Sequence, residues 1–180
     1  MNKAATKTDN DFFKDKVILR YNNLPDKDYI KVLDCYSGSC QIWNKIKQYT
    51  DKNIEVLPID IKKNRNNLKG DNIKFLKGMD ISQFDVIDLD AYGVPFQQLE
   101  EIFTKNYKGH IFVTFIQSQH GKLNNGLLYY NGISKNMIKK VKSIFYTKGF
   151  EKFKNYLAFR GVKFIKYRAH NCKYYLFFRL

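Results

Sequence analysis

The feature that most constrains the fold of this chain is the alternation of short apolar runs with helix-like stretches from residue 17 onward. Five of the apolar runs are strand-sized and end in turn or polar residues. Between them, apolar residues recur at helical spacing, as do Ile42, Trp43 and Ile46. Strands that alternate with helices form a parallel sheet that is covered on both faces. We therefore predict an α/β, doubly wound fold.

Two further strand-like runs close the chain and add an antiparallel edge to the predicted sheet. They are separated by His170 and Asn171, a two-residue connection that suits a hairpin. The seven expected strands span 29–35, 54–59, 72–76, 84–90, 110–116, 162–169 and 172–179. The expected helices span 40–49, 95–107, 134–145 and 149–160, and a connection containing Gly and Asn spans 117–132.

The length of 180 residues suits one domain of ordinary size and is too short for two. Residues 1–16 are polar and without periodicity, so we expect a mobile N-terminal arm before a single domain at 17–180. The chain contains neither an apolar run of the ~20 residues that span a membrane nor the apolar core of a signal peptide. Cys35, Cys40 and Cys172 form no CxxC pair, which argues against a disulfide framework and a zinc site. We therefore expect a cytoplasmic protein without a bound metal.

Charge is divided unevenly along the chain. Residues 1–104 hold sixteen Lys and Arg against sixteen Asp and Glu, whereas residues 105–180 hold sixteen basic residues and one acid, Glu151. Basic side chains attract phosphates, and exposed aromatic rings among them can stack on unpaired bases. An abundance of Lys throughout the chain would explain the basic residues but not the missing acids. We therefore expect a nucleic-acid-binding surface in the C-terminal part, carried by Lys139, Lys140, Lys142, Lys152 and Lys154.

A candidate nucleoside site lies at the ends of the first two expected strands. In a doubly wound sheet, ligands bind beyond the carboxyl ends of the strands, where the strand order reverses. The first strand ends there in Asp34, and Gly38 permits close approach of the backbone before a helix N-terminus. Asp60 follows Gly38 by 22 residues, close to the ~20-residue offset at which an acid accepts hydrogen bonds from ribose hydroxyls. A turn glycine and a helix-capping acid would each explain one residue, but their spacing favours a nucleoside site.

The turn after Asp34 distinguishes between two kinds of nucleoside cofactor. A dinucleotide is usually bound by G-x-G-x-x-G, but Cys40 stands where the second glycine would fall. S-adenosylmethionine has no pyrophosphate, so a site that binds it does not need the second glycine. At residues 31–180 the chain resembles the class I S-adenosylmethionine-dependent methyltransferases, which have a Rossmann-like fold. Their first motif is similar to Val32-Leu33-Asp34-x-x-x-Gly38.

This resemblance implies a set of residues that bind S-adenosylmethionine. Asp60 corresponds to the ribose-binding acid of the family, and Gly78-Met79-Asp80 is similar to the segment that carries its adenine-side acid. The implied cofactor-binding residues are Asp34, Tyr36, Ser37, Gly38, Asp60, Ile61, Met79, Asp80 and Asp88.

The sharpest motif is Asp88-Leu89-Asp90-Ala91-Tyr92-Gly93. Asp88 and Asp90 are two residues apart on an expected strand, so they point to the same side. The segment resembles the D-x-D-P-F/Y-G motif of the tRNA guanine-N2 dimethyltransferases and, more distantly, the D/N-P-P-Y motif of amino-methylating enzymes, with Ala91 in place of proline. The resemblance implies that Asp90 contacts the target amine, that Tyr92 stacks on the target base and that Asp88 helps to position the cofactor. A cluster of acids that caps the next helix is the alternative.

We predict a methyltransferase that uses S-adenosylmethionine and acts on nucleic acid, RNA (tRNA included) before DNA, at an exocyclic amine of a base. Two alternatives remain open. One is an enzyme of the same fold that methylates a small molecule or a protein. The other is a non-catalytic nucleic-acid-binding module. The replacement of a glycine by Cys40 and of a proline by Ala91 is what we would expect of a protein that had lost catalytic activity.

Overall fold

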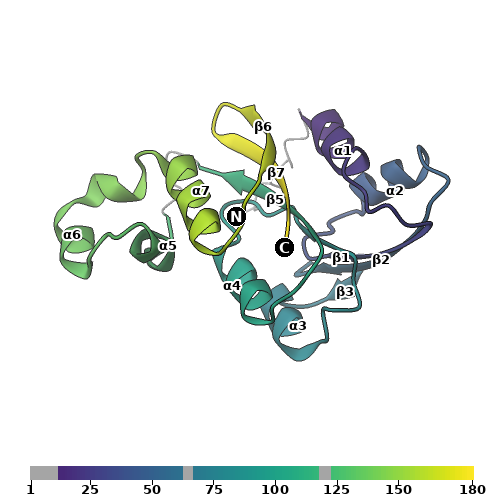
Figure 1. The fold of residues 1–180 in the computed structure, drawn as a ribbon, viewed down its shortest axis with the longest axis horizontal. Coiled ribbons are helices and arrows are strands. Elements are labelled where there is room, and N and C mark those ends of the chain that lie inside the picture. The colour runs from purple at the N-terminus through teal and green to yellow at the C-terminus, as the bar shows by residue number, and fades with distance from the viewer. Residues whose placement is uncertain (1–11, 63–66, 118–122) are drawn as a thin grey trace, which may run out of the picture.

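The computed structural model describes residues 12–62, 67–117 and 123–180. Its seven-stranded sheet has the order β3-β2-β1-β4-β5-β7-β6 (Figure 1). The parallel strands are β1 (Tyr29–Asp34), β2 (Asn53–Asp60), β3 (Leu68–Lys69), β4 (Val86–Leu89) and β5 (His110–Ile116). β7 (Lys173–Arg179) pairs antiparallel with β5 and with β6 (Lys166–His170). The predicted α/β fold, mostly parallel with a closing antiparallel hairpin, is confirmed.

Helices cover both faces of the sheet. α1 (Phe13–Tyr21) and α2 (Gln41–Lys47) pack on one face, where Val17 and Trp43 join apolar residues of β1, β4 and β7. α3 (Asn72–Gly78), α4 (Phe96–Thr104) and α7 (Gly149–Phe159) pack on the other face and form a second apolar cluster. The central strands β1, β4 and β5 are therefore buried on both sides, which explains why their sequences are continuous apolar runs.

The connection between β5 and α7 forms a small helical extension. It contains α5 (Asn125–Tyr130), α6 (Lys135–Lys140) and the 3-10 helix η1 (Lys142–Phe145). In Figure 1, α5 and α6 lie at the left end, beyond α7 and away from β1 and β2. The expected single helix at 134–145 is wrong, because the backbone of Val141 (φ −116°, ψ 86°) is not helical. None of the residues of α6 is buried, so tertiary packing does not prolong this helix.

Two elements in the first half of the chain also differ from the expectations. α1 begins at Phe13, inside the segment expected to be a mobile arm, because its buried side chains dock on the sheet. Residues 1–11 lie outside the described part of the chain. The segment 72–76, expected to be a strand, belongs to helix α3, whose first turn is capped where the N–H of Ile73 donates to the Asp71 carboxylate (2.9 Å). The third strand is instead the two-residue β3.

The remaining expected elements are present, with ends shifted by a few residues. The hairpin turn consists of Asn171 and Cys172, one residue later than predicted, and Asn171 has a φ of +52°, which Asn tolerates better than most residues. Among the described helices, none has the length and apolar character needed to cross a membrane.

Candidate active site

The carboxyl ends of β1, β2 and β4 meet at a cavity of about 330 Å³, which is in the range of small-molecule sites. β1 lies between β2 and β4, so successive connections leave it in opposite directions and open a crevice at this edge. Seven of the predicted site residues line the cavity, namely Asp34, Tyr36, Ser37, Gly38, Asp60, Asp90 and Tyr92. The structure therefore brings together residues that are up to 58 positions apart in the sequence.

The turn after β1 is tied directly to the end of β2. The backbone N–H of Gly38 donates to Asp60 Oδ2 (2.9 Å), and that of Lys62 donates to Asp60 Oδ1 (2.8 Å). Gly38 has a φ of +50°, which glycine adopts without steric cost. Cys40 has a φ of +59°, so the residue that replaces the second glycine still adopts a glycine-like backbone conformation. The spacing of Gly38 and Asp60 thus corresponds to a contact.

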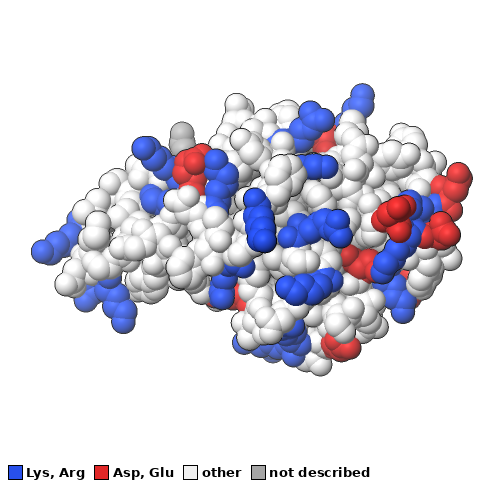
Figure 2. Space-filling view, in the orientation of Figure 1, with Lys and Arg blue, Asp and Glu red and all other residues white. Residues whose placement is uncertain are grey.

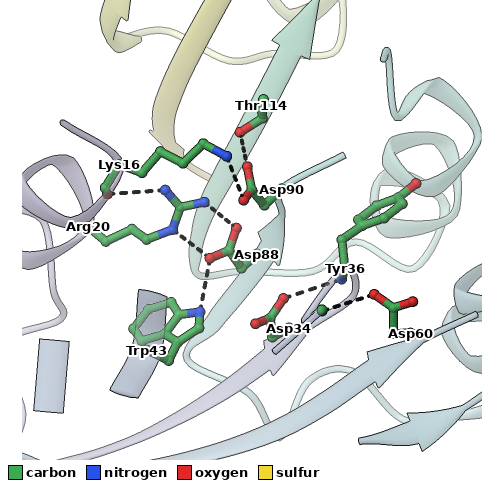
Figure 3. A network of polar contacts seen from close by, with 10 residues as sticks. Lys16, Arg20, Asp34, Tyr36, Trp43, Asp60, Asp88, Asp90 and Thr114 are labelled. Atoms are coloured by element: carbon green, nitrogen blue, oxygen red, sulfur yellow. Dashed lines mark hydrogen bonds and ion pairs between the residues drawn. The ribbon is translucent and has the colours of Figure 1, made fainter. Parts of the chain in front are cut away.

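A fully buried ion pair joins α1 to β4 beside the cavity (Figure 3). Arg20 donates through Nε and Nη2 to the two carboxylate oxygens of Asp88, each at 2.6 Å, and the indole N–H of Trp43 donates to Asp88 Oδ2 (2.9 Å). Arg20 and Asp88 are each 1% exposed. Bidentate, charge-assisted bonds of this kind are short and strong.

The contacts of Asp88 lie away from the cavity, so its predicted role stays a prediction. Asp88 does not line the cavity, and both of its carboxylate oxygens already accept hydrogen bonds from protein groups. It was expected to contact the cofactor and to take part in catalysis. In the structure it anchors α1 to the sheet.

One helical turn before Arg20, Lys16 pairs with Asp90 at the wall of the cavity. Lys16 Nζ lies 2.8 Å from Asp90 Oδ2, and the Thr114 hydroxyl donates to Asp90 Oδ1 (Figure 3). The side chains of Lys16 and Asp90 are each 14% exposed, and both line the cavity. Asp88 and Asp90 therefore point to the same face of β4, as their spacing predicted, and face two cations four residues apart on one helix.

The pKa values of two carboxyl groups at the cavity are shifted in opposite directions. Burial, together with the nearby charges of Asp88 and Asp90, raises the pKa of Asp34 well above its usual value. Burial also opposes the ionisation of Asp90, but the charges of Arg20 and Lys16, with the hydrogen bonds that Asp90 accepts, hold its pKa below the usual value. The cavity therefore disfavours ionisation of the carboxyl group at the end of β1 and favours ionisation of the one after β4.

Besides Asp88, three residues predicted to bind the cofactor do not line the cavity. Ile61 is 73% exposed and is not among the residues that line the cavity. Met79 and Asp80 follow α3, which leads away from the carboxyl ends of the strands. There the Met79 carbonyl accepts a hydrogen bond from Lys105 Nζ (2.6 Å), just after α4. Ser82 donates to the Asp80 carboxylate and lowers its pKa, so Asp80 organises a local turn.

The third strand ends earlier in the chain than predicted, before Asp80. Because the actual β3 ends at Lys69, the acid that follows the third strand at the carboxyl edge is Asp71. The side chain of its neighbour Asn72 donates to the carbonyl of Cys35 (2.9 Å), which ties this end of β3 to the turn after β1. The dipeptide Gly70-Asp71, a turn signal directly before a helix, is the sequence feature that marks this end of β3 and the start of α3.

The cavity also has a wall that the sequence reasoning missed. It is formed by residues of α1 and β7, namely Phe13, Lys16, Lys173 and Tyr175. A signal for Lys16 was present, because the carboxylates of β4 need cationic partners when buried and Lys16 and Arg20 have helical spacing. No comparable signal marked Tyr175, which reaches the site by pairing opposite Thr114.

The lysines predicted to bind nucleic acid have different surroundings. Lys139 and Lys140 are exposed in the last turn of α6. Lys152 donates to the carbonyls of Ile144 (2.8 Å) and Thr147, and burial and Lys148 lower its pKa. Lys154 pairs with Glu151 (3.0 Å). The Lys142 side chain lies outside the described part of the structure. Lys152 is therefore engaged internally, whereas α6 presents its charges outward.

Solved structures share this fold across nearly the whole chain. An S-adenosylmethionine-dependent methyltransferase from Archaeoglobus fulgidus matches with a TM-score of 0.57 at 14% identity, over 93% of this chain and 94% of that one. The fold is that of the class I methyltransferases. The precorrin-6y C5,15-methyltransferase of Geobacter metallireducens matches with a TM-score of 0.51 at 10% identity, over 91% of this chain and 86% of that one. No protein-family model and no curated protein matches the sequence.

The methyltransferase fold agrees with polar groups that the cavity leaves available. The Ser37 hydroxyl is buried and has no hydrogen-bond partner among the described residues. The Asp60 carboxylate accepts two backbone N–H groups and retains further lone pairs. Both residues line the cavity, so the donor and acceptor groups fit a nucleoside cofactor such as S-adenosylmethionine. Among the described residues, no group of three or more His, Cys, Asp and Glu side chains could hold a metal ion.

Proposed function

We propose that this chain is an S-adenosylmethionine-dependent methyltransferase that acts on nucleic acid, RNA before DNA, at an exocyclic amine of a base. The observation that carries the proposal is the cavity of the methyltransferase fold, where Asp34, Asp60 and Asp90 converge from three neighbouring strands. The similarity of residues 88–93 to the tRNA guanine-N2 dimethyltransferases favours tRNA among the RNAs and remains a prediction.

S-adenosylmethionine supplies an activated methyl group, so the task of the chain is to orient two reactants and exclude water. Asp60 would accept hydrogen bonds from the ribose hydroxyls, for which its carboxylate keeps free lone pairs. The loop 36–38 would border the same ligand, and the Ser37 hydroxyl would gain the partner that it lacks.

Asp90 is the group that would orient the acceptor amine. Its lowered pKa keeps it ionised, so it can accept an N–H of the amine and stabilise the positive charge that develops on the nitrogen. Tyr92 is 86% exposed at the cavity, which leaves its ring available to stack on a base. A base within a duplex would first have to be flipped out.

The charge distribution supports a nucleic-acid substrate. Basic side chains of the C-terminal part remain exposed, on α6 at Lys135, Lys139 and Lys140 and elsewhere at Lys148, Lys163 and Arg168. In Figure 2 the far left end, over α6, shows Lys and Arg but no Asp or Glu. With one acid after residue 105, this surface would attract the phosphates of a nucleic acid.

The cofactor site is tested by calorimetry with S-adenosylmethionine and S-adenosylhomocysteine. Asp60→Ala should weaken binding by about 1–3 kcal/mol, because a charged acceptor of the ribose hydroxyls is lost. Asp80→Ala is the matched control, since it removes a carboxylate that does not line the cavity. A loss of affinity in Asp80→Ala and not in Asp60→Ala would contradict our placement of the cofactor.

The substrate class is tested by transfer of a labelled methyl group to unmodified RNA transcripts, DNA, protein and small-molecule extracts. RNA-dependent transfer is expected. Label in protein or in small molecules would favour the enzyme of the same fold with another substrate. RNA binding by a chain that binds neither cofactor form would favour the non-catalytic module.

The nucleic-acid surface is tested by reversing charges on α6. The double variant Lys139→Glu/Lys140→Glu should bind RNA more weakly and flatten the salt dependence, by roughly 0.7 in the log–log slope per lost single-strand phosphate contact. Lys14→Glu/Lys47→Glu makes the same charge change at exposed positions of α1 and α2. Equal losses in both variants would mean that only net charge matters.

A further inference from the structure

The side of the cavity formed by Lys16, Asp90 and Tyr175, here called the acceptor side, carries a cation that methyl transfer itself does not require. Lys16 Nζ lies 2.8 Å from Asp90 Oδ2 and 5.2 Å from the centroid of the Tyr175 ring. All three residues line the cavity. The carboxylate that would orient the acceptor amine is therefore already paired with an ammonium group.

The position of this cation is fixed by the helix that carries it. Four residues on, Arg20 is bound in the buried pair with Asp88, and Arg20 Nη1 also donates to the Lys16 carbonyl (3.1 Å). α1 cannot move without breaking these bonds. Only the flexible stem of Lys16 can shift, so its charge stays close to Asp90 whichever ligand enters.

We propose that Lys16 is a specificity-determining residue that restricts the acceptor to a neutral amine and rejects alkylammonium groups. This inference rests on the proposed function. A second cation at Asp90 would be repelled by Lys16 over a short distance in a poorly solvated cavity. A neutral amine meets no such repulsion, because the oxygens of Asp90 can each accept more than one hydrogen bond.

This restriction distinguishes between the classes of methyl acceptor that an enzyme of this fold could use. The exocyclic amine of a nucleobase is conjugated with the ring and neutral at pH 7, whereas a lysine side chain or a polyamine is protonated. The Lys16–Asp90 pair therefore selects for a base and against a lysine. Removing the charge of Lys16 would leave an unpaired carboxylate, which attracts cations.

The test compares three variants with the wild type. Lys16→Met removes the charge and keeps an unbranched apolar stem, Lys16→Arg restores a cation, and Lys14→Met is a matched control at an exposed position of the same helix. Binding of n-butylammonium and of 9-ethylguanine is measured by NMR titration, with and without saturating S-adenosylhomocysteine. Thermal unfolding is measured in parallel.

Lys16→Met is expected to bind n-butylammonium at least tenfold more tightly than the wild type, with the affinity for 9-ethylguanine changed less than threefold. Lys16→Arg and Lys14→Met are expected to behave like the wild type. Equal affinity of Lys16→Met and the wild type for n-butylammonium would overturn the inference. So would a lower unfolding temperature with no change in ligand preference, since it would leave Lys16 only a structural role.

Failure of the proposed function gives a different result. If the chain is not a methyltransferase, S-adenosylhomocysteine does not bind the wild type, and if it methylates another class of substrate, S-adenosylhomocysteine binds but labelled methyl groups do not enter RNA. The comparison of n-butylammonium binding without cofactor still reports on the charge of Lys16.

Discussion

The two ion pairs between α1 and β4 differ in how much of each is open to the cavity. Arg20 and Asp88 are each 1% exposed and joined by two bonds of 2.6 Å, whereas Lys16 and Asp90 are each 14% exposed and joined by one contact of 2.8 Å. The planar guanidinium matches a carboxylate bidentately, and an ammonium on a flexible stem is a mobile point charge. The same packing of α1 on β4 thus places a structural ion pair, Arg20–Asp88, next to an ion pair that faces the cavity, Lys16–Asp90.

The largest expected effect comes from breaking the inner pair. Arg20→Ala should lower the free energy of unfolding by about 3–5 kcal/mol, because it leaves the buried Asp88 carboxylate without its cation. Denaturant-induced unfolding measures this loss. Arg168→Ala, at an exposed position of β6, should change the free energy of unfolding by no more than about 0.5 kcal/mol. A similar small change for Arg20→Ala would show that the inner pair is not the anchor.

Breaking the outer pair should affect chemistry more than stability. Asp90→Ala should slow methyl transfer by about 10²–10³-fold, as expected when a preorganised group facing developing charge is removed. Its affinity for S-adenosylhomocysteine should stay within about threefold of the wild type, and its loss of stability should be smaller than that of Arg20→Ala. Single-turnover transfer and calorimetry measure the two properties.

Asp85→Ala is the matched control for Asp90→Ala. It removes an ion pair with Lys27 (2.5 Å) immediately before β4, away from the cavity. If Asp85→Ala slowed methyl transfer as much as Asp90→Ala, the effect would belong to the strand as a whole.

A smaller effect is expected on the free energy of unfolding, which should depend on pH in opposite ways through Asp90 and Asp34. Because the folded-state pKa of Asp90 is lowered, its ionisation stabilises the fold above about pH 4 and this contribution is lost as the pH falls through that pKa. Burial raises the pKa of Asp34, so its ionisation destabilises the fold as the pH rises from about 4 through the raised value. Asp90→Asn should therefore destabilise at pH 7, and Asp34→Asn should stabilise there.

Unfolding measured at a series of pH values tests this opposition. Both effects should diminish below about pH 4, where the two carboxyl groups are protonated in the unfolded chain. Changes of the same sign in the two variants would contradict the opposite pKa shifts of Asp34 and Asp90.

The doubly wound fold was predictable because β1, β4 and β5 are buried on both faces and their sequences show this as apolar runs. The contact between Gly38 and Asp60 was also predictable, since it joins the ends of two consecutive strands at a fixed offset. These features depend on local sequence and on a general property of the sheet.

The errors arose where local sequence permits two structures. Ile73, Phe75 and Leu76 fit a short strand or a helical turn, and the cap formed by Asp71 favours the helix. The third strand is therefore 68–69 and not 72–76. The partners of Lys16 and Arg20 could not be found by periodicity, because they lie on a strand far along the chain.

The distance along the chain between the partners of these ion pairs sets the conformational entropy that is lost when the cavity forms. Arg20 and Asp88 are 68 residues apart, and Lys16 and Asp90 are 74 apart. Closing a loop of this length costs more conformational entropy than closing the 22-residue loop between Gly38 and Asp60. Thr114 and Tyr175 come from strands later still in the sequence. The two sides of the cavity therefore differ in what they cost the chain to assemble: the turn after β1 meets the end of β2 through a short loop, whereas the charge balance at Asp90 requires elements from both ends of the chain.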